Sequence, residues 1–169
     1  MDVVLVLLRL LHIVAAFAWV GLAAAVTFYI APAALAAGES GMRFLKTLLT
    51  RTSFGSIFGA SAGVTMLAGL LLYAIGDAFS HFSQTGNIVL GIGAVAGILA
   101  GIHGGAVVGR STRELGEALA KTVPDGGGTI AADAQRTLNE LGAKLLSHAR
   151  LSMVLMIIAL VGMGSARYL

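Results

Sequence analysis

Apolar residues gather in four long runs along the chain, and shorter segments between the runs carry most of the charges. The runs cover about residues 3–31, 56–75, 88–109 and 149–167. A helix of about 20 apolar residues crosses the hydrocarbon core of a bilayer, and each run approaches or exceeds this length. The pattern predicts an all-α, polytopic membrane protein, with four transmembrane helices bundled in one membrane domain, residues 1–169.

The segments between the runs predict further helices. Pro32 marks the position where the first helix should end or kink, because proline has no backbone N–H. Residues 39–54 mix basic and apolar side chains, which is typical of an amphipathic helix at the membrane surface. Residues 110–147 alternate charged residues with leucines around the breaker sequence from Pro124 to Gly128. We predict a helical hairpin here that protrudes from the membrane with its leucines facing inward.

The distribution of Lys and Arg predicts the orientation. On one side of the membrane lie three basic residues of the first connector and six of the hairpin and its flank, namely Arg43, Lys46, Arg51, Arg110, Arg113, Lys121, Arg136, Lys144 and Arg150. On the other side lie Arg9 and Arg167. Because short cytoplasmic connectors carry the excess of basic residues, we expect the connectors to be cytoplasmic and both termini to lie outside.

Composition supports a membrane protein and narrows its chemistry. Hydrophobic residues make up 57% of the 169 residues and charged residues 11%, whereas about a quarter of a soluble domain is charged. The absence of cysteine excludes disulfides, thiolate metal sites and a cysteine nucleophile. A net charge of +3 is too weakly basic to indicate nucleic acid. The partner that composition predicts is the lipid bilayer.

Glycine recurs at every fourth position in the second and third runs. In lipid, small residues at this spacing allow two helices to approach backbone to backbone. We therefore predict tight helix packing and a homo-oligomer that forms through the glycine faces, Gly55, Gly59, Gly63, Gly93, Gly97, Gly101 and Gly105.

Histidines are the candidate ligands for a metal or a haem. His12 and His103 lie inside apolar runs, where an ionisable residue is a functional candidate. His103 lies inside the predicted cytoplasmic boundary at Arg110, and His148 lies at that boundary beside Arg150. His81 lies in the loop before the third run. Imidazole ligates haem iron, copper and zinc. From their positions we expect no two histidines to be level within one chain, so a bis-histidine haem would need two copies related by a two-fold axis. The alternative is that each one only forms hydrogen bonds to a neighbouring helix.

His12 shares a helical face with Trp19, and the small residues between and beyond them leave room for a planar group. We predict a cofactor site at His12, His103 and Trp19, and metal ligands among His12, His103 and His148. Thioethers suit Cu(I), but a methionine stripe at helical spacing is more often a packing surface. The stripe in the last run is Met153, Met156 and Met163.

The stretch Leu11-His12-Ile13-Val14-Ala15-Ala16-Phe17-Ala18-Trp19-Val20-Gly21 resembles the first span of the copper-resistance D type of bacterial membrane proteins. It also resembles a related family of small integral membrane proteins. The ending Met163-Gly164-Ser165-Ala166-Arg167-Tyr168 is similar to the close of that small family. The resemblance implies a protein of the bacterial inner membrane with haem b or copper at His12.

These observations lead to two functions of different classes. The first is a membrane protein that binds haem b through intramembrane histidine and transfers electrons, with copper handling as the variant. The second is a cofactor-free structural or interaction protein that docks a partner through its cytoplasmic hairpin. The sequence contains no nucleophile elbow, phosphate loop or HExxH motif, so no enzymatic reaction is assigned.

Overall fold

The computed structural model describes residues 3–75 and 84–169, and within these residues the chain is helical without strands. His81 lies outside the described residues. The elements are α1 (Val3–Ala25), the π-helical η1 (Val26–Ile30), α2 (Ala31–Ala36), α3 (Glu39–Arg51), α4 (Phe54–Ile75), α5 (Thr85–His103), the π-helical η2 (Gly104–Val108), α6 (Gly109–Thr122), α7 (Ala132–Ser165) and the 3-10 helix η3 (Ala166–Tyr168).

Four continuous helices among these residues are long and apolar enough to cross a membrane. They run over Val3–Ala36, Phe54–Ile75, Thr85–Thr122 and Ala132–Tyr168. Large apolar side chains point outward from each of them, as Phe17, Leu67, Ile102 and Val161 do. Such side chains fit contact with lipid, because lipid tails are as apolar as the side chains themselves.

Pro32 does not end the first helix, which continues to Ala36. The proline lies in the first turn of α2, directly after the π-helical segment η1. In this segment the N–H of Ala31 bonds the carbonyl of Val26, five residues earlier. Because Pro32 supplies no N–H, the regular ladder is already interrupted at this point, and the helix accommodates the interruption by one wider turn.

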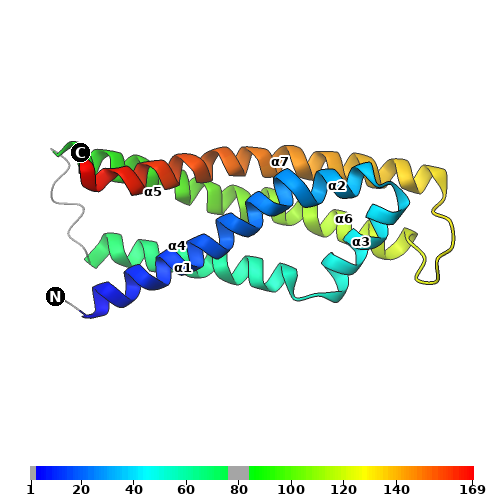
Figure 1. Ribbon diagram of the computed structural model, residues 1–169, viewed down its shortest axis with the longest axis horizontal. Helices are drawn as coiled ribbons and strands as arrows, with labels where there is room; N and C mark the ends of the chain where they lie inside the picture. The colour runs from blue at the N-terminus through cyan, green and yellow to red at the C-terminus, as the bar shows by residue number, and fades with distance from the viewer. Residues whose placement is uncertain (1–2, 76–83) are drawn as a thin grey trace.

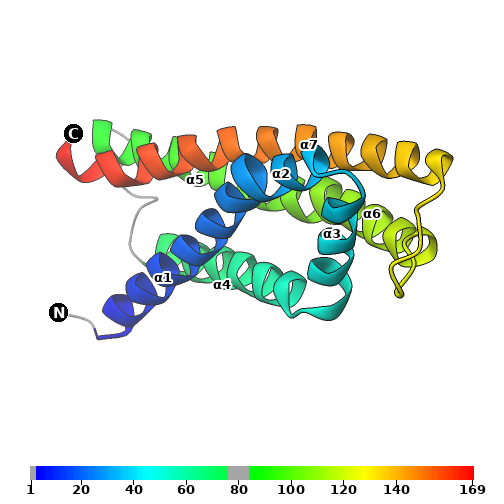
Figure 2. The same ribbon diagram turned by 45° about the vertical axis from the view of Figure 1, so that its right-hand side comes forward.

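The four helices pack as two pairs. α1 lies along α4 and α5 lies along α7, whereas α4 and α5 touch over a short stretch (Figure 1). Both termini lie at one end of the molecule and the turn between α6 and α7 lies at the other (Figure 1). Near that second end α3 runs across from α2 to α4 (Figure 2).

The glycine ladder of α5 packs within the chain over part of its length. A Cβ on Gly93 would lie 2.9 Å from the backbone N of Met163, and one on Gly162 would lie 2.9 Å from the Cα of Gly93. The two backbones therefore touch directly. Gly101 lies beneath Met66 of α4, where a Cβ would be 2.9 Å from Sδ. Other members meet no atom within 4 Å, namely Gly55, Gly59, Gly63 and Gly105, and the predicted homo-oligomer can use only faces of this open kind.

The end of the molecule that holds α3 has a hydrophobic core of the type found in soluble proteins. Met42 of α3, Leu119 of α6 and Leu138 of α7 are fully buried in it. Burying a large apolar side chain contributes about 1.5–3 kcal/mol where water is the alternative. The leucines of the predicted hairpin thus face inward, and α3 covers them.

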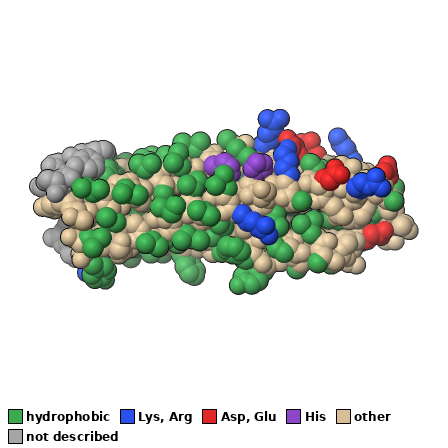
Figure 3. Space-filling model, turned by 90° about the horizontal axis from the view of Figure 1, so that it is seen from above, with side chains coloured by type: hydrophobic (Ala, Val, Ile, Leu, Met, Phe, Trp, Pro, Cys, Tyr) green, Lys and Arg blue, Asp and Glu red, His purple; other side chains and the backbone are tan. Residues whose placement is uncertain are grey.

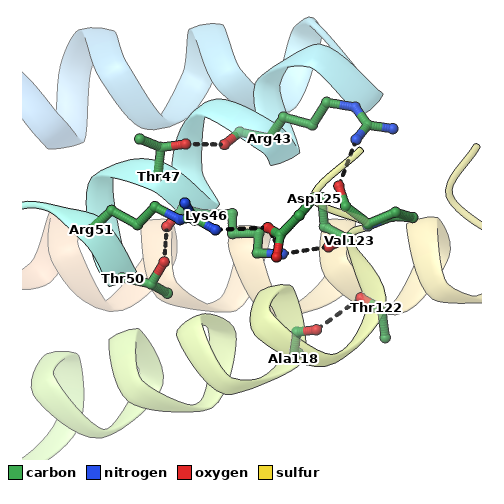
Figure 4. Close-up of polar contacts among 10 residues, drawn as sticks. Arg43, Lys46, Thr47, Thr50, Arg51, Ala118, Thr122, Val123 and Asp125 are labelled. Atoms are coloured by element: carbon green, nitrogen blue, oxygen red, sulfur yellow. Dashed lines mark hydrogen bonds and ion pairs between the residues drawn. The ribbon is translucent and has the colours of Figure 1, made fainter. Parts of the chain in front are cut away.

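The basic residues of α3 bind the loop between α6 and α7 (Figure 4). Lys46 Nζ lies 2.7 Å from Asp125 Oδ1 and donates to the carbonyl of Val123 at 2.6 Å, and Arg51 Nη2 lies 3.0 Å from the same carboxylate. Arg43 donates to the carbonyls of Pro124 and Gly128. The hydrogen bond from Lys46, followed by the charges of Lys46 and Arg51, lowers the pKa of Asp125.

Gly93→Ala is expected to destabilise the bundle, because the added methyl group meets the backbone of α7 and neither backbone can retreat. Overpacking of this kind costs about 1–3 kcal/mol. The matched control is Gly97→Ala one turn away, where a Cβ lies at an ordinary 3.6 Å from Ala159 Cβ. Circular-dichroism melts in detergent should show a lower midpoint for Gly93→Ala than for Gly97→Ala. Equal midpoints would contradict the close contact.

Asp125→Asn is expected to free the loop at residues 123–130 while global stability changes little, since the carboxylate is largely exposed. Its lowered pKa means that the ion pairs contribute fully above the ordinary carboxyl pKa and are lost as pH falls through the lower folded value. Amide hydrogen exchange of 123–130 should therefore be faster in Asp125→Asn at neutral pH. The control is Asp133→Asn, since Asp133 forms no ion pair within the described residues. Equally fast exchange in the two variants would refute the role of Asp125.

Candidate functional site

His12 of α1 is half-buried, and its side chain lies against α4 in a fixed orientation. Its Nδ1 lies 2.9 Å from the backbone carbonyl of Thr65. A carbonyl can only accept, so Nδ1 carries the proton, and in the neutral ring the free lone pair is at Nε2. The ring lies over Gly69, where a Cβ would be 2.8 Å from Cε1. Gly69 is therefore the residue that makes room for the imidazole.

This arrangement is the one that metal-ligating histidines use. Such a histidine donates one ring N–H to a carbonyl or carboxylate, which fixes the tautomer and leaves the other nitrogen for the metal. The hydrogen bond of His12 meets the first requirement within the apolar part of the bundle. Within the described residues, no second histidine lies near it in the same chain.

Trp19 lies apart from His12, although the two residues share a helical face in the sequence pattern. The indole is 4% exposed and packs with Ala23, Ala100, Met153 and Met156, between α1 and the α5–α7 pair. His12 packs instead against α4. The structure thus divides the predicted site between two places, because α1 contacts different helices along its length.

His103 and His148 lie together, which the prediction that no two histidines are level did not anticipate. His148 lies about one helical turn from the level of His103, and the two side chains bring the rings into contact. Their ring centroids are 5.9 Å apart, at an interplanar angle of 64°, and His103 Nδ1 lies 2.8 Å from Ser152 Oγ. The prediction treated Arg110 and Arg150 as marking one depth. Because Ser152 lies opposite His103 and the two helices run in opposite directions, Arg150 of α7 lies opposite Gly105. Gly105 is about 7.5 Å along its helix from Arg110, so Arg110 and Arg150 do not mark the same depth.

His103 and His148 are both half-buried. Figure 3 shows histidine side chains at the surface, where apolar side chains give way to charged ones. The nearby carboxylate of Glu114 already binds Arg110 at 3.0 Å and Lys144 at 3.2 Å. No group of three or more His, Asp or Glu side chains within residues 3–75 and 84–169 is placed to hold a metal ion. The pair alone does not complete a metal site in one chain.

A central cavity of about 690 Å³ lies between the α1–α4 pair and the α5–α7 pair. Small-molecule sites occupy about 300–1,000 Å³ and have mainly apolar walls. The walls here include Trp19, Phe58 and Met156, together with glycines from α4, α5 and η2. Neither His12 nor His103 is among the residues that line it. A haem in this cavity would therefore meet a thioether but no imidazole of the described chain.

Among the described residues that line the cavity, Thr27 and Ser152 are the buried polar ones. Ser152 is engaged by His103. Thr27 is only 2% exposed, and its hydroxyl has no hydrogen-bond partner within the described residues. By contrast, Thr65 and Thr112 each donate to the carbonyl four residues earlier. The Thr27 hydroxyl is not one of the fully buried unsatisfied atoms of the described chain, so its oxygen stays accessible from the cavity that Thr27 lines. A hydroxyl in this position can bond an occupant, which makes Thr27 a candidate ligand-binding residue.

Sequence reasoning missed both of these residues. Their hydroxyls lie in apolar runs, where serine and threonine usually bond their own helix, so the sequence carries no signal that Thr27 is unpaired. Ser152 could have been found as a polar residue of the last span that faces His103, but only with the correct register of α5 on α7.

Comparisons of the chain with protein-family models, with curated proteins and with solved structures found no match. The arguments for function therefore start from the residues described above.

Gly69→Ala is expected to displace the His12 ring, because the added methyl group would lie only 2.8 Å from Cε1. The ¹⁵N spectrum of histidine-labelled protein at alkaline pH should assign the proton of His12 to Nδ1, with His12→Gln identifying the signal. In Gly69→Ala this preference should weaken toward the ordinary mixture of tautomers. The control is Gly63→Ala on the same helix, where no atom lies within 4 Å of the new methyl group. A His12 signal protonated at Nε2 in the wild-type protein would contradict the hydrogen bond.

Proposed function

We propose that this protein binds haem b in the membrane through His12 and transfers electrons by means of it. The observation that carries the proposal is the hydrogen bond from His12 Nδ1 to the carbonyl of Thr65. It leaves Nε2 as the free ligand atom, within an apolar run of the first helix. Haem held by imidazole supplies one-electron redox chemistry. The chain's own contribution is to orient His12 through Thr65 and Gly69.

The site is completed by a second copy of the chain in this proposal. Within residues 3–75 and 84–169 no second histidine lies near His12 to complete a six-coordinate haem, and a two-fold axis would place the two His12 residues at the same depth. Gly63 of α4 supports this, because it is exposed, meets no atom within 4 Å and does not line the central cavity. A second copy could approach it closely beside the helix that holds Thr65.

The orientation in this proposal follows the charges, with both termini outside and α3 and the hairpin in the cytoplasm of a bacterium. The termini share one end of the molecule, and Arg43, Lys46 and Arg51 lie at the other, where they bind the α6–α7 loop (Figures 1 and 4). An excess of basic residues at one end is what the positive-inside rule uses.

The contacts favour haem over the two alternatives. The apolar stripe of the hairpin is buried against α3, so a docking function would have to use its polar outer surface. Met153 and Met156 pack around Trp19 as ordinary core residues, which weakens the case for a thioether copper site.

The test is an absorption spectrum of detergent-purified protein from haem-replete cells, in the oxidised and dithionite-reduced states. We expect a Soret band in the wild-type protein and its loss in His12→Ala and His12→Gln. Free imidazole should restore the band in His12→Gly, because the cavity left by the side chain accepts the ligand. His103→Ala and His148→Ala are the matched controls and should keep the band.

Two results of this experiment would contradict the proposal in different ways. A colourless wild-type protein would overturn haem binding. A Soret band that survives in His12→Ala but disappears in His103→Ala would move the ligand to the histidine pair and overturn the assignment of His12.

A further inference from the structure

The central cavity exists because both of its walls lack side chains at the same depth. Gly59 of α4 and Gly105 of η2 line it, and a Cβ on either residue would meet no atom within 4 Å. The same holds for Gly55 and Gly104. Elsewhere in the bundle, at Gly93 and Gly162, glycine brings backbones into contact. The cavity glycines instead leave space that no other part of the described chain fills.

Access to this space is from the lipid phase. Gly59 and Gly105 line the cavity and are accessible at its surface. Both lie about five residues inside their spans, counted from Phe54 and from Arg110, which places them within the apolar part of the helices. A molecule dissolved in the membrane can therefore reach the cavity between α4 and η2 without crossing water.

The polar groups that line the cavity indicate which polar group a ligand should carry. The hydroxyl of Thr27 has no partner in the described chain and can donate a hydrogen bond to the occupant. The charged residues of the lining, Arg113 and Glu117, belong to α6 and have opposite signs. A neutral group with an acceptor oxygen suits Thr27 better than a carboxylate or a phosphate does, because burying an unpaired charge is far more costly than burying a carbonyl.

The aromatic side chains that line the cavity indicate the shape of the apolar part of the ligand. Trp19 and Thr27 lie on one face of the first helix, two turns apart, and Phe58 lines the cavity from α4. An aromatic ring favours offset or edge-on contact with another ring, and glycine walls accept a flat group. A long apolar tail can leave through the lipid-facing opening.

We propose that the central cavity binds a neutral, lipid-soluble ring compound with a carbonyl acceptor and an apolar tail, the chemical class of the isoprenoid quinones. The carbonyl accepts a hydrogen bond from Thr27, and the ring lies between Trp19 and the glycines of α4 and η2. This site is separate from the His12 site and does not depend on haem.

Trp19 is the single tryptophan of the chain and lines the cavity, so its fluorescence reports the occupant directly. The experiment titrates decylubiquinone into the detergent-purified full chain and follows quenching of Trp19. The His12→Ala background is used alongside the wild type, so that bound haem does not quench the signal. Saturable quenching with the same affinity in both backgrounds is the expected result.

Binding measurements on three variants and a control test whether the ligand occupies the central cavity. Gly59→Leu and Gly105→Leu fill the cavity without a backbone clash and should weaken binding at least tenfold. Thr27→Val removes the hydroxyl at nearly constant volume and should weaken binding about two- to tenfold, as expected for one hydrogen bond, without lowering the melting midpoint. Gly21→Leu is the control, because Gly21 is exposed, meets no atom within 4 Å and lies outside the cavity lining.

Each other outcome overturns the proposal. Quenching that is linear and identical in all variants shows partition into the micelle. Quenching by a dibrominated phospholipid that decylubiquinone does not displace shows an acyl-chain occupant. Loss of a dimer in Gly105→Leu without any change in quenching shows that a second copy fills the space. Unchanged affinity in Thr27→Val removes the carbonyl contact.

Discussion

Direct contact between the backbones of α5 and α7 determines where the other groups of this molecule lie. In lipid the hydrophobic effect does not draw helices together, so close packing must hold them. Gly93 and Gly162 provide that packing, because neither helix carries a side chain at the contact. The register that results places Ser152 opposite His103 and brings His148 within 5.9 Å of its ring. A shift of one turn would separate all three residues.

Different interactions stabilise the two ends of the bundle, namely close helix packing at one end and the burial of large apolar side chains at the other. Toward the termini the helices meet through glycine, alanine and a few hydrogen bonds such as His12 to Thr65, because lipid gives no advantage to burying leucine. At the other end Met42, Leu119 and Leu138 form a core, and Lys46 and Arg51 bind Asp125. That core implies water around this end. The change in residue type along the bundle therefore marks where the membrane should end.

Hydropathy was enough to predict the four long helices, because each run is apolar over its length. Contacts between helices were harder to predict. The glycine spacing indicated tight packing, but it could not show that Gly93 contacts α7 while Gly105 faces open space. The depth of the histidines was judged from Arg110 and Arg150, although the helix register and not the charge boundary sets which residues are level. His12 was identified from its type and its run, whereas its tautomer depends on a carbonyl of another helix.

Pro32 affects the cavity through the backbone of the turn that precedes it. A proline inside a continuous helix removes one N–H from the ladder, and the preceding turn widens into η1. Thr27 lies in that wider turn, and unlike Thr65 or Thr112 it does not bond the carbonyl four residues before it. A hydroxyl that its own helix would normally satisfy is thereby left on the cavity wall. The wide turn before Pro32 is therefore the structural reason that this hydroxyl has no partner in the described chain, and it leaves the hydroxyl open to an occupant of the cavity.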